Sequence, residues 1–272
     1  MPTIVDALNR TLEVPRTPQR IISLVPSLTE WLFALGLGDR VVGVTDFCTQ
    51  PAAAVAQKPR LRGTKNPDRA RILALEPDLI IANKEENRER DVLALAEAGL
   101  AVYVTDPCTV AGAIETLATL AEILDAGEAA RPQIDEMRAL YAAATADAQS
   151  GPRVLVPIWR DPWMAIGADT YAADLLRVCG GQNVALSLDG RYPRFELAQI
   201  AVLQLELILL PSEPYAFSPV DLPALAPVFS GAVHFVDGEL LTWYGPRIPQ
   251  ALRFFRGLFD QPTVAPVDKN DL

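Results

Sequence analysis

Apolar runs and helical patterns alternate along the first third of the chain. The run Ile21–Val25 predicts a buried strand, and the helical pattern of Glu30–Leu35 follows it and stops at Gly36. The alternation continues with expected strands at Val41–Thr45, Leu79–Ala82 and Ala101–Thr105 and expected helices at Asp68–Leu75 and Asn87–Ala98. Strands that alternate with helices predict a mainly parallel sheet with helices on both faces.

The same alternation resumes in the second half of the chain. Strands are expected at Arg153–Ile158, Leu207–Leu210 and Val233–Val236, and helices at Tyr171–Val178 and Ala251–Phe259. Between the halves, apolar positions three or four residues apart mark one helix from Val110 to Leu124 and a second from about Gly127 to about Gln149. The second helix, about 30 Å long at 1.5 Å per residue, is long enough to join two lobes rigidly. The alternative is two ordinary packing helices within one domain.

We therefore expect an α/β protein with an N-terminal lobe (1–126), a connecting helix (127–150) and a C-terminal lobe (151–272). An internal repeat supports two related lobes. Leu75–Ile81 is similar to Leu203–Leu209 at a constant offset of 128 positions, and the pairs Ile72/Ile200 and Glu85/Glu213 have the same offset. A repeat of this length indicates duplication of one α/β unit.

Composition and charge narrow the possible partners. Half of the 272 residues are hydrophobic, which is enough for a sizeable core, and the net charge is −10. An acidic surface repels nucleic acid and anionic lipid, and no run approaches the about 18–20 apolar residues of a membrane span. The first residues, Met1 to Asp6, show no leader pattern, and three cysteines fit no disulfide framework. These features predict a cytoplasmic protein, or a periplasmic or extracellular one if the sequence is trimmed.

Signals for catalysis are weak. The single histidine, His234, lies in an apolar run and is interpreted as a core or edge residue of a strand. No nucleophile–base pattern, metal-ligand spacing or phosphate-binding loop occurs. The polar stretch from Glu85 to Arg90 follows a strand and opens a helix, so it is either a helix cap or a ligand-facing rim. We expect no enzyme activity, no catalytic cofactor and no metal site.

Several segments in order resemble one family. They are Arg20–Glu30, Gly36–Thr45, Leu75–Ile80, Gly180–Val184 and Arg191–Pro193. Together they resemble the helical-backbone (class III) substrate-binding proteins of the cobalamin and iron–siderophore type, most closely the cobalamin branch. The resemblance implies two Rossmann-like lobes joined by one long rigid helix, with a ligand held in the cleft between them. The implied ligand is a corrinoid or another metal chelate. The alternatives are an iron–siderophore or haem receptor of an ABC importer, and a cytosolic corrinoid-handling enzyme or chaperone.

One departure from the family concerns transport. Members that serve an importer present a carboxylate on each lobe, which docks on permease arginines. Aligning the segments places Ala70 and Ala198 at those positions, and the nearest carboxylates, Asp68 and Glu196, lie two residues earlier. Two helical steps rotate a side chain by about 200°, so these carboxylates are expected to point elsewhere. Docking on a permease is therefore doubtful.

Candidate ligand contacts lie in loops that follow the expected strands. In the first lobe they are Pro26, Ser27, Phe47, Cys48, Lys65, Asn66, Glu85 and Asn87, and in the second Trp159, Arg160, Trp163, Tyr192, Trp243 and Tyr244. Large flat side chains suit a flat, largely apolar ring, although the tryptophans also suit packing between the lobes. Arg160 and Lys65 suit ligand carboxylates or amides, or else surface ion pairs. Cys48 is either a ligand to a metal or a buried thiol.

Overall fold

The computed structural model describes residues 3–146 and 150–260, and the chain divides into two units. The first unit comprises Met1–Pro107, Ala113–Asp135 and Tyr244–Pro246, and the second comprises Cys108–Gly112, Glu136–Trp243 and Arg247–Leu272. Met1, the expected helix end at 147–149 and the segment 261–272 lie outside the described residues. The expected α/β class is confirmed, with one four-stranded parallel sheet in each unit.

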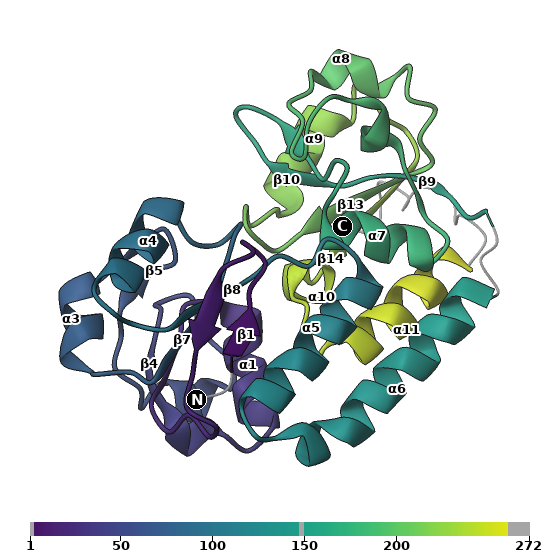
Figure 1. Cartoon of the computed structure of the whole chain (residues 1–272). Coiled ribbons are helices and arrows are strands. Elements are labelled where there is room, and N and C mark those ends of the chain that lie inside the picture. Colours follow the sequence, from purple (N-terminus) through teal and green to yellow (C-terminus); the bar gives the residue numbers. More distant parts are fainter. Residues whose placement is uncertain (1–2, 147–149, 261–272) are drawn as a thin grey trace. The chain divides into compact units, whose positions relative to one another are not determined.

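The first unit is built on a sheet in which every neighbouring pair of strands is parallel (Figure 1). In spatial order the strands are β4 (Val41–Val44), β3 (Ile21–Ser23), β7 (Leu79–Asn83) and β8 (Val102–Thr105). All five residues of β7 are buried, which explains why this strand reads as a continuous apolar run. Its side chains enter a core with those of α4, among them Val92 and Leu95.

The remaining elements of this unit surround the sheet. The helices are α1 (Pro26–Ala34), α2 (Ala52–Val55), α3 (Arg69–Ala74) and α4 (Glu89–Glu97), with the short turn η1 (Gly38–Arg40). Two antiparallel hairpins are β1 (Thr3–Val5) with β2 (Thr11–Glu13) and β5 (Arg62–Gly63) with β6 (Asn66–Pro67). Helix α1 begins four residues earlier than the pattern predicted, because Pro26 suits the first position of a helix.

The second unit repeats the same sheet. In spatial order its strands are β12 (Gln182–Asn183), β9 (Arg153–Leu155), β13 (Leu207–Pro211) and β14 (Ala232–Val236), all parallel. The buried strand β13 stands at the place of β7, and both of its ends are offset from those of β7 by the 128 positions of the sequence repeat. The structural repeat therefore coincides with the sequence repeat.

The helices that precede these two strands correspond as well. Asp68 and Glu196 are the N-cap residues of α3 and α8 (Leu197–Ile200), and Ile72 and Ile200 are buried under them. The other elements of the second unit are α7 (Tyr171–Val178), α9 (Leu222–Leu225), α10 (Gly238–Thr242), α11 (Ile248–Phe259), η2 (Val184–Ser187) and η3 (Pro219–Asp221).

One expected strand was wrong. The run Arg153–Ile158 forms β9 and then a separate strand, β10 (Pro157–Trp159), which pairs antiparallel with β11 (Met164–Ala165). Pro157 has no N–H to donate, so it does not continue the hydrogen-bonded ladder of the parallel sheet. Residues 160–163 therefore form the turn of this hairpin.

Two consecutive helices belong to both units. Helix α5 covers Val110–Ile123, and α6 covers Gly127–Ala146, the 20-residue helix drawn in teal in Figure 1. Asp125, at φ 56°, separates the two helices, and Gly127 is the first residue of α6 rather than a break within it. The division between the units falls inside α6, between Asp135 and Glu136.

Helices α1 and α7 end in the same way. Gly36 after α1 and Gly180 after α7 have φ of 73° and 97°. In each case the following N–H bonds back to a carbonyl five residues earlier, Leu37 to Leu32 at 2.9 Å and Gly181 to Leu176 at 2.8 Å. This is the Schellman ending, which favours glycine because other residues are strained in the left-handed region.

Two glycine-to-alanine substitutions are expected to have opposite effects. At Gly36 an added Cβ meets no atom within 4 Å, so the left-handed backbone alone should cost about 1–2 kcal/mol of unfolding free energy. At Gly257, exposed inside α11 with equal space, Gly257→Ala should stabilise by about 0.5–1 kcal/mol. Urea denaturation of both variants measures the difference, and equal effects would contradict the assigned conformation.

A glutamate follows the central strand in each unit at the same offset, and the second one is half-buried. Glu213 Oε1 accepts from the Trp243 Nε1–H at 2.8 Å and from the Thr242 hydroxyl at 3.1 Å. Burial raises the pKa of Glu213, as does the charge of Asp237, against the lowering effect of those hydrogen bonds and of Arg247. The net direction is upward.

A raised carboxyl pKa makes stability depend on pH. Between the unfolded pKa, about 4.3, and the higher folded pKa, the folded state binds more protons, so stability falls as pH rises. Glu213→Gln keeps an oxygen acceptor and cannot ionise, so the variant should lose less stability than the wild type as pH rises from about 4. Urea denaturation followed by tryptophan fluorescence at several pH values tests this. Glu97→Gln, at an exposed site on α4, is the control, and parallel profiles for E213Q and wild type would refute the assignment.

Candidate functional site

A buried polar network closes the carboxyl ends of the strands in the first unit. Asn83, the last residue of β7, donates from Nδ2 to the Tyr244 hydroxyl oxygen at 2.7 Å and to the Thr105 carbonyl oxygen at 3.0 Å. The hydroxyl oxygens of Tyr244 and Thr105 lie 3.1 Å apart. All three residues are buried, and burial is the main cause of the raised pKa of Tyr244. The phenol of Tyr244 is thus enclosed within this unit.

Two asparagines hold the loop that follows β7. Asn83 Oδ1 accepts from the backbone N–H of Glu85 at 2.8 Å. Asn87 Oδ1 accepts from the Asn83 N–H at 2.8 Å, and its Nδ2 donates to the carbonyl oxygens of Leu24 at 3.3 Å and Thr64 at 3.0 Å. The buried amide of Asn87 therefore joins three loops at this edge of the sheet.

Four of the candidate residues come together beside this loop. Phe47 is 60% exposed, and its ring packs on the β5–β6 hairpin, where a Cβ added to Gly63 would lie 3.2 Å from it. Asn66 and Lys65 are exposed in the same hairpin, and Lys65 Nζ donates to the carbonyl oxygen of Glu85. Phe47, Lys65, Asn66 and Glu85 thus form one accessible group, the Phe47 cluster.

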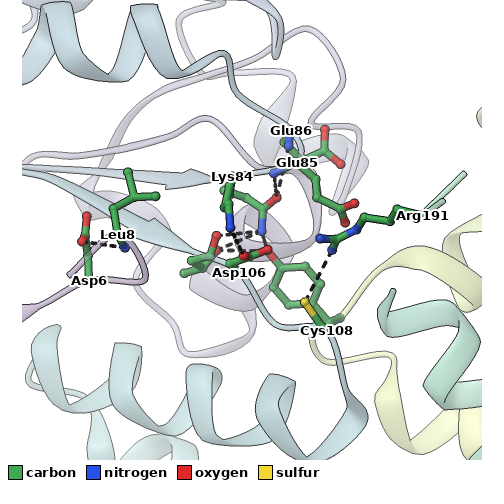
Figure 2. A network of polar contacts seen from close by, with 11 residues as sticks. Asp6, Leu8, Lys84, Glu85, Glu86, Asp106, Cys108 and Arg191 are labelled. Carbon is green, nitrogen blue, oxygen red and sulfur yellow. Dashed lines mark hydrogen bonds and ion pairs between the residues drawn. The ribbon is translucent and has the colours of Figure 1, made fainter. Parts of the chain in front are cut away.

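An ion pair also joins the residues that directly follow β7 and β8. Lys84 Nζ lies 2.8 Å from Asp106 Oδ2, as Figure 2 shows beside Glu85 and Glu86. Helix α4 begins at Glu89 after Arg88, which makes no side-chain cap. Glu85 is therefore not a cap of this helix, and the ligand-facing alternative stays open for it.

The remaining candidates of the first unit are buried. Pro26 and Ser27 form the first turn of α1. The Cys48 sulfur accepts a hydrogen bond from the Thr29 hydroxyl at 3.0 Å and lies 3.2 Å from the Thr45 hydroxyl oxygen. Burial raises the pKa of Cys48 despite these hydrogen bonds, which keeps it a neutral thiol. The buried-thiol interpretation of Cys48 fits this environment.

In the second unit the β10–β11 hairpin carries the exposed aromatic residue. Trp159 is 44% exposed, and its ring meets that of Tyr215 edge to face, with centroids 5.9 Å apart. Tyr215 in turn lies 4.6 Å from Phe217, in the loop that follows β13. An aromatic row therefore leads from the core of the unit to its surface.

Trp163, from the same hairpin, lies at the buried end of that row. It is 9% exposed, stacks on Phe217 at 5.9 Å and contacts Phe195 at 6.1 Å. These rings belong to the hydrophobic core under β13. Trp163 therefore packs in the core of the second unit.

Arg160 extends from the hairpin turn to a buried carboxylate. Its Nη1 donates to Asp221 Oδ1 at 2.5 Å, and its guanidinium carbon lies 5.8 Å from the centre of the Trp163 ring. Asp221 Oδ1 also accepts from the Tyr215 hydroxyl at 3.3 Å, and Oδ2 accepts from the Ser218 N–H at 2.9 Å. Burial would raise the pKa of Asp221, but these hydrogen bonds and the Arg160 charge outweigh it and lower the pKa.

Two further candidates of this unit differ in exposure. Tyr192 is exposed, in a segment whose Arg191 and Pro193 carbonyl oxygens accept from Gly167 and Ala165 beside β11. Trp243 is buried, with its indole N–H bonded to Glu213 and Arg247 over its ring at 5.2 Å. Of these two, Tyr192 is accessible to a ligand and Trp243 stabilises the unit.

The sequence interpretation missed Tyr215, Phe217 and Asp221. The sequence did contain a signal for these residues. Their loop follows the apolar run Leu207–Leu210 and includes Glu213, which the internal repeat pairs with Glu85. His234 is exposed on β14, the edge strand of its sheet, as one of its two interpretations required.

Two features, a metal-binding cluster and a membrane-spanning helix, do not occur in the described residues. No group of three or more His, Cys, Asp or Glu side chains in residues 3–146 and 150–260 is placed to hold a metal ion. None of the helices in that part of the chain has the length and apolar content of a membrane span.

Comparison with known proteins identifies relatives. The family described as periplasmic binding protein matches residues 21–210. A vitamin B12-binding protein of Vibrio cholerae serotype O1 is 28% identical over 204 residues, covering 72% of this chain and 72% of that protein.

Solved structures share the fold. The periplasmic vitamin B12 binding protein BtuF of Vibrio cholerae has a TM-score of 0.75 at 24% identity, covering 90% of this chain and 98% of that one. The periplasmic heme-binding protein RhuT from Roseiflexus sp. RS-1 has a TM-score of 0.74 at 23% identity, covering 89% and 97%. At these identities the likeness establishes the fold alone.

The expected cytoplasmic location is contradicted. That expectation relied on the first residues and on the cysteine pattern, whereas the matched family and both structures are described as periplasmic. The family match covers more than half of the chain, and the sheets and long helix are those that the resemblance implied. The chain therefore belongs to the periplasmic binding protein family, in its helical-backbone class of the cobalamin and iron–siderophore type.

Proposed function

We propose that this protein binds a corrinoid of the cobalamin type, without transforming it. The observation that carries the proposal is the similarity, over about seven-tenths of the chain, to proteins named vitamin B12-binding protein. Haem is the competing ligand, because several proteins of the same fold are named heme-binding. Both ligands are flat metal chelates.

Exposed and half-buried side chains at the carboxyl ends of the strands are the proposed contacts, Glu85 and Arg160 being the half-buried ones. In the first unit these are the residues of the Phe47 cluster, and in the second Trp159, Arg160 and Tyr192. Accessible aromatic faces suit a flat ring, and the amide and charged groups suit its polar rim. Pro26, Ser27, Cys48, Asn87, Trp163, Trp243 and Tyr244 are buried and are proposed to support these contacts rather than to make them.

Titration with cobalamin tests the ligand class. We expect saturable quenching of tryptophan fluorescence at one ligand per chain, and unaltered cobalamin after release. Trp159→Ala should weaken binding about tenfold, because it removes an exposed aromatic surface worth about 1.4 kcal/mol. Phe254→Ala, a similarly exposed aromatic on α11, is the control and should change affinity less than about twofold.

Failure would be clear in this experiment. No response up to about millimolar cobalamin, weaker than about −4 kcal/mol, would retire the corrinoid proposal. Saturable binding of ferric haem under the same conditions would then make haem the ligand.

We propose further that the protein does not dock on a permease through paired carboxylates. Ala70 on α3 and Ala198 on α8 are exposed at the two corresponding positions. Asp68 and Glu196 are used as N-caps, where Asp68 accepts from the Arg71 N–H and Glu196 forms a capping box with Gln199. Their carboxylates are therefore committed to their own helices.

Docking can be measured against the permease of an ABC importer for cobalamin. The wild type should bind it no better than Asp68→Ala and Glu196→Ala variants do. The double variant Ala70→Glu/Ala198→Glu should bind at least about tenfold more tightly, because each new carboxylate offers a charged contact. Tight binding by the wild type would contradict this part of the proposal.

A further inference from the structure

The carboxylate of Asp221 has no access to water, yet it receives donors from three directions. Its side chain is 1% exposed, whereas that of its partner Arg160 is 29% exposed. The Ser218 N–H and the Tyr215 hydroxyl complete its hydrogen bonds. A buried carboxylate with these partners holds a cation in one place with its outer face in solvent.

The guanidinium of Arg160 keeps donors for another group. Within the described residues only Nη1 makes a hydrogen bond, to Asp221, while Nε lies 3.8 Å from the exposed Asp161 carboxylate. The plane of the group is held by Asp221 on one side and by the Trp163 ring at 5.8 Å. Arginine has five N–H donors in a fixed fork, so a second anion can bind while the first bond persists.

An accessible flat surface adjoins these donors. Trp159 is next to Arg160 in the chain, and its indole meets the ring of Tyr215, whose hydroxyl bonds to the same Asp221. One buried carboxylate thus orients both the cation and the ring on which Trp159 rests. We call Trp159, Arg160, Tyr215 and Asp221 the Arg160 platform, and all four lie in the second unit.

We infer that the Arg160 platform binds an anionic oxygen group on the rim of a flat metal chelate. Trp159 contacts the ring, Arg160 binds a carboxylate or phosphodiester oxygen, and Asp221 and Tyr215 are positioning residues. The inference rests on the proposed function and adds which substituent the protein selects. A pre-oriented cation lowers the ordering cost of binding, which is why a buried partner favours selectivity.

Matched ligand pairs test this selectivity. Cobalamin carries a phosphodiester that cobinamide lacks, and haemin carries carboxylates that its dimethyl ester lacks. The wild type should prefer the anionic member of the pair that it binds by about tenfold, the usual size of one charge-assisted hydrogen bond. Arg160→Gln should reduce the preference below about twofold, because it should weaken binding of the anionic member more than that of the other member.

Three variants separate positioning from simple stabilisation. Asp221→Asn and Tyr215→Phe keep Arg160 and should lower the preference part of the way, and Tyr215→Phe serves if Asp221→Asn does not fold. Trp159→Ala should weaken both members of a pair equally and leave the preference unchanged. A purely structural role would lower the thermal midpoint without changing the preference.

The outcomes are distinct. A folded Arg160→Gln protein that keeps the wild-type preference overturns the inference, and so does a wild type that binds both members of a pair equally. A wild type that binds none of the four ligands overturns the proposed function, and the inference falls with it. The pair that shows the preference identifies the group as phosphodiester or carboxylate.

Discussion

Each unit depends on a five-residue strand inside its sheet that is buried along its whole length, β7 in the first and β13 in the second. A strand in the middle of a parallel sheet has no face in water, so its side chains are apolar and its backbone groups bond to neighbouring strands. At its carboxyl end the chain leaves the sheet and this bonding stops. The loops that follow therefore need other polar partners, and two candidate residues, Glu85 and Asn87, lie in the loop after β7.

The two units meet that need with different chemistry. In the first unit the buried Asn83 and Asn87 supply both donors and acceptors to the loop, and Lys65 donates to the Glu85 carbonyl oxygen from the surface. In the second unit Glu213 and Asp221 supply carboxylates, which only accept and must draw donors from elsewhere. The donors are an indole, hydroxyls and a guanidinium, so the second unit has a cation and aromatic rings at its edge. The buried side chains that hold these loops therefore differ between the units, amides in the first and carboxylates in the second.

The sequence predicted the scaffold well, because its signals are local. The apolar runs of β7 and β13 and the glycines that end α1 and α7 follow from the backbone requirements of those few residues. The division of Arg153–Ile158 into two strands depended on which partner Pro157 pairs with, and that is a long-range property. The roles of the candidate residues were equally non-local, since Trp159 and Trp163 lie in one loop and differ in exposure.

An anchoring aromatic residue differs here from a ligand-facing one in the hydrogen bonding of its polar group. In an anchoring residue the indole N–H or the phenol hydroxyl has a hydrogen-bond partner inside the protein. Trp243 and Tyr244 are adjacent, yet the indole N–H bonds to Glu213 in the second unit and the phenol bonds to Asn83 in the first. Because both tips are satisfied inside the protein, burying these rings costs no unpaired polar group. Trp159 makes no such bond within the described residues and remains exposed at the surface, with its ring edge to face against that of Tyr215. An exposed indole held in this way loses little by covering its face with a ligand, and an indole whose N–H is already bonded in the core has nothing left to offer one.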